Sequence, residues 1–159
     1  MKILFCPWRK LAQLVAGEET HTAAILSSSM EPEPSRLPKI PYVFRQYEDI
    51  DVLIPGRSFS EEDAQAFADF IRGLDGSVDT LYCCCDVAKS RSPAVAAAVC
   101  RYFKQSDSHI WHDPFVQPNM LVFDLLTTAF GIPVADEEKD RLLYENRQAF
   151  RNAIRSGGQ

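Results

Sequence analysis

The sequence predicts a single-domain α/β fold: three layers, with a mostly parallel sheet of four to five strands flanked by helices. Three observations support this prediction. Short apolar runs typical of buried strands alternate with longer segments of helical periodicity. Such alternation is typical of a parallel sheet that helices cover on both faces. The chain has 159 residues, which is the size of one domain with one core.

The strands and helices are inferred from the pattern of apolar residues and from residues typical of helix ends. Strands are expected at four apolar segments, 2–6 (KILFC), 22–28 (TAAILSS), 42–47 (YVFRQY) and 78–85 (VDTLYCCC). A weak helical period covers 8–16, and clearer ones predict helices at 61–74, 92–104, 118–130 and 136–154. Ser60 and Ser92 are expected to be N-caps, because a serine side chain accepts hydrogen bonds from free N–H groups of a first helical turn. Four prolines make 29–41 an extended surface loop.

Composition limits the class of protein. We expect one domain over 1–155 and a flexible tail over 156–159. The net charge of −5 gives no reason to expect nucleic acid or an anionic membrane as partner, and no apolar run has the length of a membrane span. Five cysteines, three of them adjacent, do not form a disulfide framework, so we expect free thiols and a cytoplasmic location. The oligomeric state stays open.

The segment LYCCCDVAKSRSPAVAAAV (81–99) is the main functional signal. An apolar strand leads into Cys85, a short loop follows, and Arg91 stands at the mouth of a helix. Loop N–H groups and a helix N-terminus in this arrangement can converge on a tetrahedral oxyanion, and their positive field favours a reactive thiolate. Arg91 can hold two oxygens in a planar fork, and Ser92 can donate a hydrogen bond to the sulfur.

Each of these residues also has a structural interpretation. Cys85 can be a small buried residue at a strand end, but the loop with Arg91 and Ser92 favours a nucleophile. Lys89 is either a solvated loop residue or a group that attracts a polyanionic head group. The three histidines are too scattered to bind a metal, so neither metal nor cofactor is expected.

Three segments carry a resemblance to a known family. CDVAKSRS (85–92) followed by PAVAAAV resembles the phosphate-binding loop of protein tyrosine phosphatases, in particular the small dual-specificity-like branch. QPNMLVFDLL (117–126) resembles that branch's helix opening with Pro-Asn. The stretch 48–71 resembles, more loosely, a segment in which an acid-bearing loop precedes a helix. The resemblance implies a dual-specificity phosphatase-like fold and a metal-free, two-step phosphoryl transfer through phosphocysteine, acting on a phosphorylated protein or a small phosphomonoester.

The resemblance also implies residue roles. Cys85 would be the nucleophile, and the phosphate would be bound by the loop that follows, namely Asp86, Val87, Ala88, Lys89, Ser90 and Arg91. Asp51 is preferred as the general acid because its spacing from Cys85 resembles the family's, and Asp49 is the alternative. Asn119 is expected to cap its helix and to support the loop.

Two positions depart from the family pattern. Cys84 stands where the family usually has histidine, and Ala88 where it usually has glycine. A catalytically impaired pseudophosphatase that binds phosphorylated ligands is therefore the alternative function. A rhodanese-like sulfurtransferase is a third possibility, although its shorter loop fits the spacing less well.

Overall fold

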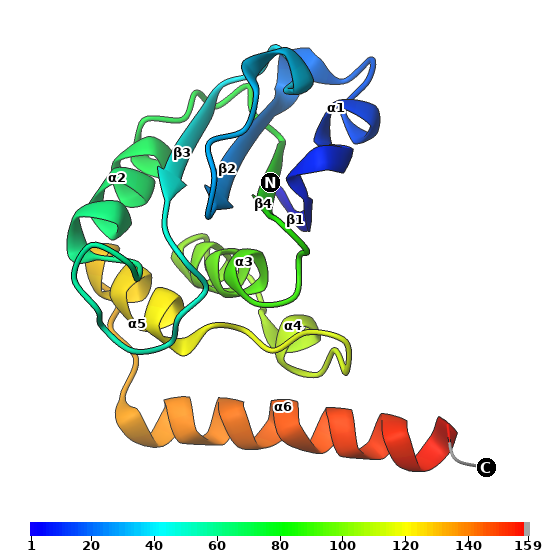
Figure 1. The fold of residues 1–159 in the computed structure, drawn as a ribbon, viewed down its shortest axis with the longest axis vertical. Coiled ribbons are helices and arrows are strands. Elements are labelled where there is room, and N and C mark those ends of the chain that lie inside the picture. The colour runs from blue at the N-terminus through cyan, green and yellow to red at the C-terminus, as the bar shows by residue number, and fades with distance from the viewer. Residues whose placement is uncertain (158–159) are drawn as a thin grey trace.

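A computed structural model describes residues 1–157 and contains one four-stranded sheet (Figure 1). The strands are β1 (Lys2–Pro7), β2 (Thr22–Ser28), β3 (Tyr42–Gln46) and β4 (Thr80–Cys85). Their order is β1-β4-β2-β3, and each neighbouring pair is parallel. The predicted α/β fold with a parallel sheet is confirmed.

The described residues form six α-helices. These are α1 (Leu11–Leu14), α2 (Glu61–Arg72), α3 (Arg91–Tyr102), α4 (Ser108–Trp111), α5 (Met120–Ala129) and α6 (Asp136–Gly157). The described residues also contain three short 3-10 helices, η1 (Trp8–Lys10), η2 (Glu19–His21) and η3 (Pro34–Arg36). The short α4 was not predicted, because four residues are too few to show a helical period. Within residues 1–157, no helix is at once long enough and apolar enough to cross a bilayer.

The ends of two helices differ from the prediction. The N-cap of α3 is Ser90, so the predicted N-cap at Ser92 is wrong. Ser92 lies inside the first turn, where its hydroxyl accepts a hydrogen bond from Cys85 and is not available for capping. Helix α6 continues past the expected end at residue 154 to Gly157, and residues 158–159 of the expected flexible tail lie outside the described residues.

The N-cap at Ser60 is as predicted. Its side chain accepts a hydrogen bond from the Asp63 N–H over 3.1 Å, and the Asp63 carboxylate accepts one from the Ser60 N–H over 3.0 Å. This reciprocal pair satisfies two N–H groups at the start of α2.

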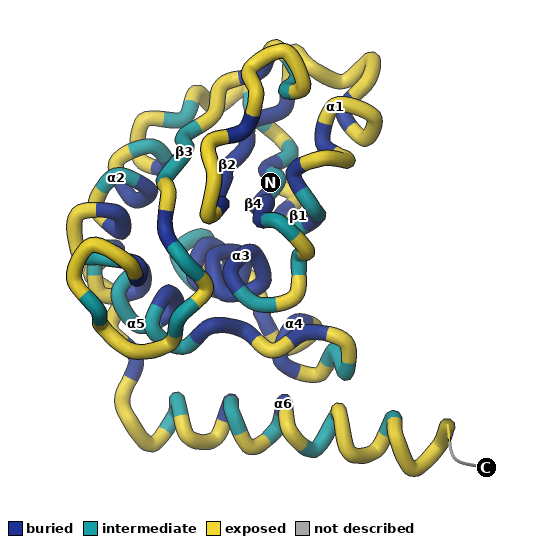
Figure 2. Tube along the Cα trace, in the orientation of Figure 1, coloured by how far each residue is buried: buried dark blue, intermediate teal, exposed yellow. Residues whose placement is uncertain are grey.

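The two faces of the sheet bury alternate residues of each strand. Leu81 and Cys83 of β4 belong to the larger core, on the side of α2, α3 and α5. Cys84 faces the other way, into a smaller core with Trp8 and Leu11 of the η1–α1 segment. Helix α3 is almost wholly buried over its first ten residues (Figure 2), and its alanines let it lie close to the sheet.

Helix α6 lies away from the sheet, beyond α4 and α5, along the lower edge of the view in Figure 1. Leu142 and Asn146 are its buried residues. Asn146 Nδ2 donates hydrogen bonds to the carbonyls of Trp111 and Val116, at 3.1 and 3.0 Å. These bonds fix α6 against the end of α4 and the segment that follows it.

Candidate active site

The loop 85–91 begins at the carboxyl edge of the sheet. Because the four strands are parallel, their carboxyl ends meet at this edge, and it is where open parallel sheets usually bind ligands. Cys85 is the last residue of β4, and Arg91 is the first residue of α3. The short loop between them therefore joins the central strand to the buried helix.

Cys85 lies at the base of the loop. The residue is 1% exposed. Its Sγ accepts a hydrogen bond from the Ala88 N–H and donates one to Ser92 Oγ, both over 3.2 Å. The loop therefore curls around the sulfur, and two of the sequence-predicted residues contact it directly.

Ala88 has a backbone conformation that favours glycine. Its φ is +57°, in the left-handed region. The Cβ of an L-residue is crowded there, at a cost of about 1–2 kcal/mol. This is the loop position where the resembled family usually has glycine, and here an alanine holds the left-handed conformation under strain.

Arg91 is buried and held by three hydrogen bonds. Its Nη1 donates to the Tyr47 carbonyl at 2.8 Å and to Ser29 Oγ at 3.1 Å. Its Nη2 donates to Asp86 Oδ2 at 2.8 Å. The guanidinium group is thus fixed in position by residues that follow β2, β3 and β4.

The side chain of Asp86 is enclosed by donors. Its Oδ1 accepts from Ser28 Oγ at 2.7 Å and from Trp8 Nε1 at 3.0 Å. Burial on its own raises the pKa of this carboxyl, but the hydrogen bonds from Ser28 and Arg91 outweigh burial, and the pKa lies below its usual value. Asp86 is therefore an ionised partner of Arg91 at neutral pH.

Sequence reasoning missed the residues that hold the loop from neighbouring strands. These are Trp8, Ser28, Ser29 and Tyr47. Each lies at or just after the carboxyl end of a strand. That position is the signal that could have found them, since such residues gather at one edge of a parallel sheet.

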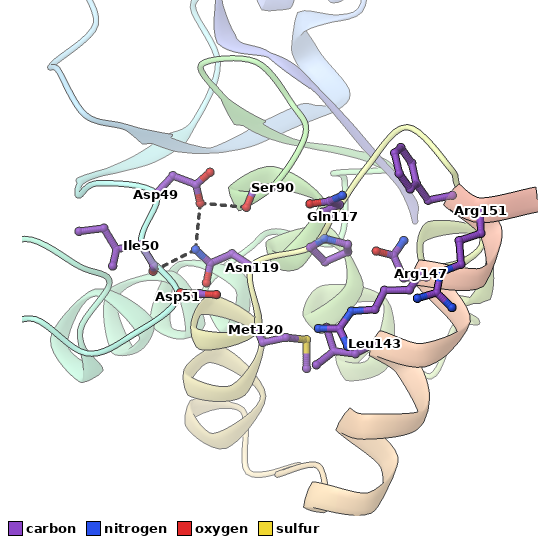
Figure 3. A pocket seen from close by; sticks show the side chains of 13 residues that line it. Asp49, Ile50, Asp51, Ser90, Gln117, Asn119, Met120, Leu143, Arg147 and Arg151 are labelled. Carbon is purple, nitrogen blue, oxygen red and sulfur yellow. Dashed lines mark hydrogen bonds between the residues drawn. The ribbon is translucent and has the colours of Figure 1, made fainter. Parts of the chain in front are cut away.

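The other end of the loop is fixed by Asp49 and Asn119. Asp49 Oδ1 accepts hydrogen bonds from Ser90 Oγ and Asn119 Nδ2, each over 2.9 Å (Figure 3). The Asn119 N–H donates to the Ser90 carbonyl over 3.1 Å. Asn119 also caps α5, because its Oδ1 accepts from the Val122 N–H over 3.1 Å. The structure thus connects Asn119 both to its helix and to the loop.

Asp51, Val87 and Lys89 are exposed. Asp51 lines a cleft beside the loop together with Asp49 (Figure 3). Within residues 1–157, Asp51 makes no side-chain hydrogen bond or ion pair, whereas Asp49 makes two hydrogen bonds. The two candidate acids therefore differ in their surroundings although both are near the loop.

The remaining cysteines are buried thiols. Burial raises the pKa of Cys83 well above its usual value and that of Cys100 to about 11. The Sγ atoms of Cys6 and Cys84 are 3.5 Å apart across β1 and β4. Their hydrogen bond lowers the pKa of Cys6 and raises that of Cys84.

Among the described residues, no group of three or more His, Cys, Asp or Glu side chains lies close enough to hold a metal ion. No protein family model matches the chain, and no curated protein sequence matches it. Among solved structures, the crystal structure of human DUSP28 resembles it with a TM-score of 0.42 and 14% sequence identity, covering 97% of this chain and 94% of that one. The chain's own geometry defines a parallel α/β domain with a buried cysteine and a buried arginine on one loop at the carboxyl edge of its sheet.

Proposed function

We propose that this protein is a cysteine-dependent phosphomonoester hydrolase of the protein tyrosine or dual-specificity phosphatase type, with Cys85 as the nucleophile. The observation that carries the proposal is the position of the Cys85 sulfur between the Ala88 N–H and Ser92 Oγ, on the loop that leads to Arg91. A nucleophilic thiolate needs donors nearby and an anion site in front of it. The loop supplies both from adjacent residues.

The hydrogen bonds of Arg91 support its role toward phosphate. A guanidinium group has five N–H donors, and three of them are used by Tyr47, Ser29 and Asp86. Two donors are therefore left for an anion, which is the number a bidentate contact with phosphate requires. The helix N-terminus adds to this, because the N-cap Ser90 makes no side-chain capping bond to α3 and the first N–H groups are free to face an anion.

The reaction proceeds in two displacements. The Cys85 thiolate attacks phosphorus, an S–P bond forms, and the bond from phosphorus to the leaving oxygen breaks. A water molecule then attacks the phosphocysteine, the S–P bond breaks, and inorganic phosphate is released. In the second step the Ser92 hydroxyl, 3.2 Å from Sγ, stabilises the departing thiolate.

We assign the general acid to Asp51. It protonates the leaving oxygen in the first step and takes a proton from water in the second. Asp49 fits this role less well, because its carboxylate already accepts hydrogen bonds from Ser90 and Asn119. We assign Asp49 and Asn119 to positioning of the loop.

The substrate we propose is a phosphorylated protein or a small phosphomonoester, hydrolysed without metal or cofactor. A cytoplasmic location belongs to the same proposal, since the nucleophile has to stay a free thiol.

A second candidate is a pseudophosphatase that binds phosphorylated ligands without turnover. The observation that favours it is the ion pair between the buried Arg91 and the half-buried Asp86, whose carboxylate repels an incoming anion. The strained backbone at Ala88, with its left-handed φ, also favours the pseudophosphatase.

An assay with an aryl phosphate in the presence of chelator separates the two candidates. We expect turnover by the wild type and none by Cys85→Ser. Absence of turnover, together with phosphate binding that Arg91→Lys abolishes, would favour the pseudophosphatase. Equal turnover by wild type and Cys85→Ser would contradict both the nucleophile and the mechanism.

A further inference from the structure

A large cleft opens beside the loop, with a volume of about 710 Å³. One wall is the segment 49–51, and the opposite wall is α6, which contributes Arg147 and Arg151 (Figure 3). A second hollow of about 450 Å³ shares Asp49, Ser90, Gln117 and Phe150 with the cleft and extends past Lys89. The combined surface therefore leads from the Cys85–Arg91 loop to α6, and it has room for more than a phosphate group.

The two walls of the cleft carry opposite charges: Asp49 and Asp51 lie on one wall, and two arginines of α6 lie on the other. Arg147 and Arg151 are one helical turn apart on the same face of α6, and within residues 1–157 neither makes an ion pair or a side-chain hydrogen bond. Arg141 on the same helix is different, since it pairs with both Glu138 and Glu145. Like charges at this spacing repel each other and destabilise a helix. Their position on the cleft is explained if an anion binds between or beside them.

The basic wall is held in a fixed relation to the loop. Asn146, next to Arg147, donates hydrogen bonds to the carbonyls of Trp111 and Val116. The chain then continues to Gln117, whose N–H donates to the Lys89 carbonyl over 2.8 Å. This series of bonds connects α6 to the loop, so an anion at the arginines lies at a defined place relative to a phosphate at Cys85.

We propose that the cleft binds an acidic side chain of a phosphorylated protein substrate, so that the protein prefers phosphorylated residues with a second anionic group close by. This inference rests on the proposed function, because it takes the loop as the site of the hydrolysed phosphate. The guanidinium groups of Arg147 and Arg151 bind the carboxylate of a flanking Glu or Asp. A second phosphate presents the same chemistry to the arginines.

The rest of the surface fits a polypeptide. Phe115 and Phe150 line the second hollow and are 79% and 43% exposed, which provides apolar contacts for neighbouring side chains. Asp51 on the opposite wall disfavours an acidic side chain there. The bound peptide is therefore oriented with its acidic residue toward α6.

The test measures binding of fluorescent phosphopeptides to Cys85→Ser, which removes the nucleophile and leaves the rest of the loop. The probes carry one phosphotyrosine flanked by Glu, by Ala, by Lys, or by a second phosphorylated residue. We expect the Glu peptide to bind roughly 3- to 10-fold more tightly than the Lys peptide. The difference is modest because the charge-assisted hydrogen bonds from the arginines to the carboxylate are partly exposed to solvent. The doubly phosphorylated peptide distinguishes phosphate from carboxylate as the preferred second anion.

A charge reversal gives the sharper result. In the Arg147→Glu/Arg151→Glu double variant, the order should invert, with the Lys peptide binding more tightly than the Glu peptide. Arg155→Glu is the matched control, because Arg155 is exposed on α6 and does not line the cleft. This control should keep the wild-type order.

Several results would overturn the inference. These are equal affinity for the Glu and Lys peptides, the same shift in the double variant and in Arg155→Glu, or binding of phosphoinositide vesicles that depends on Arg147 and Arg151 without any discrimination among peptides. If the loop is not the phosphate site on which the proposed function depends, the result looks different: Arg91→Lys would then leave the affinity of every phosphopeptide unchanged.

Discussion

Arg91 Nη2 donates a hydrogen bond to Asp86 Oδ2 over 2.8 Å, so the loop proposed to bind an anion already contains one. The side chain of Arg91 is 6% exposed and that of Asp86 27%, so solvent screens this pair only partly. Asp86 positions the guanidinium group and at the same time reduces the positive potential of the loop. The balance between these effects can be measured.

Asp86→Asn should bind phosphate or vanadate roughly 3- to 10-fold more tightly than the wild type. The substitution removes a negative charge near the anion. It keeps one oxygen that can accept from Arg91, while its amide nitrogen replaces the oxygen that accepts from Ser28 and Trp8. Isothermal titration calorimetry with phosphate measures the affinity. Asp79→Asn makes the same change in net charge just before β4, at the opposite edge of the sheet, and should have little effect. Weaker binding by Asp86→Asn would mean that positioning outweighs repulsion.

Stability at acid pH should depend on Asp86. Its pKa is lowered in the folded state from the usual value of 3.8. Its contribution to the free energy of unfolding is therefore present above that value and is lost as the pH falls through the lowered folded pKa. As the pH falls from 6 through 3.8 and below, urea unfolding should show a larger loss of stability for the wild type than for Asp86→Asn. Equal losses would contradict the lowered pKa.

Ala88→Gly should stabilise the protein by up to about 1.5 kcal/mol. Relief of the left-handed strain gains about 1–2 kcal/mol, and the greater freedom of glycine in the unfolded chain offsets about 0.5–1 kcal/mol of it. Lys104 has the same φ of +57° outside the loop, so Lys104→Gly is the matched control. Urea unfolding should show a gain for both variants, whereas phosphate affinity should rise only for Ala88→Gly. If the phosphate affinity of Ala88→Gly is the same as that of the wild type, the strain at Ala88 has no effect on anion binding.

Asp51→Asn should slow the turnover of phenyl phosphate far more than that of nitrophenyl phosphate. A poor leaving group needs a proton as it departs, and general-acid catalysis contributes about 10²–10⁴-fold in rate. The ratio of kcat values for the two substrates is the measurement. Asp49→Asn is the paired control and should lower both rates together, since Asp49 contacts Ser90 of the loop. The reverse pattern would move the acid to Asp49.

The strands were predictable because each is a short apolar run, and their alternation with helices was enough to predict a parallel sheet. Strand order was not predictable, because KILFC and TAAILSS have similar patterns and nothing local shows that β4 lies between β1 and β2.

The same distinction applies to the site. Cys85, Arg91 and Ser92 lie on one short segment, so their spacing could be recognised from the sequence. The contacts of Trp8 with Asp86 and of Tyr47 with Arg91 join separate strands and need the fold to be known. The place of Arg147 and Arg151 on the cleft could not be predicted, since nothing in the sequence places α6 beside the loop.

The strand order has a consequence for how the protein folds. The register pairs Cys6 with Cys84, and β1 has no neighbour in the described sheet other than β4. Contacts between residues so distant in sequence form slowly, because a long loop has to close first. We therefore expect amides of β1 to become protected from hydrogen exchange no earlier than those of β2 during refolding. The hydrogen bond from Trp8 to Asp86 would then form late, and incompletely folded chains would lack an assembled anion site.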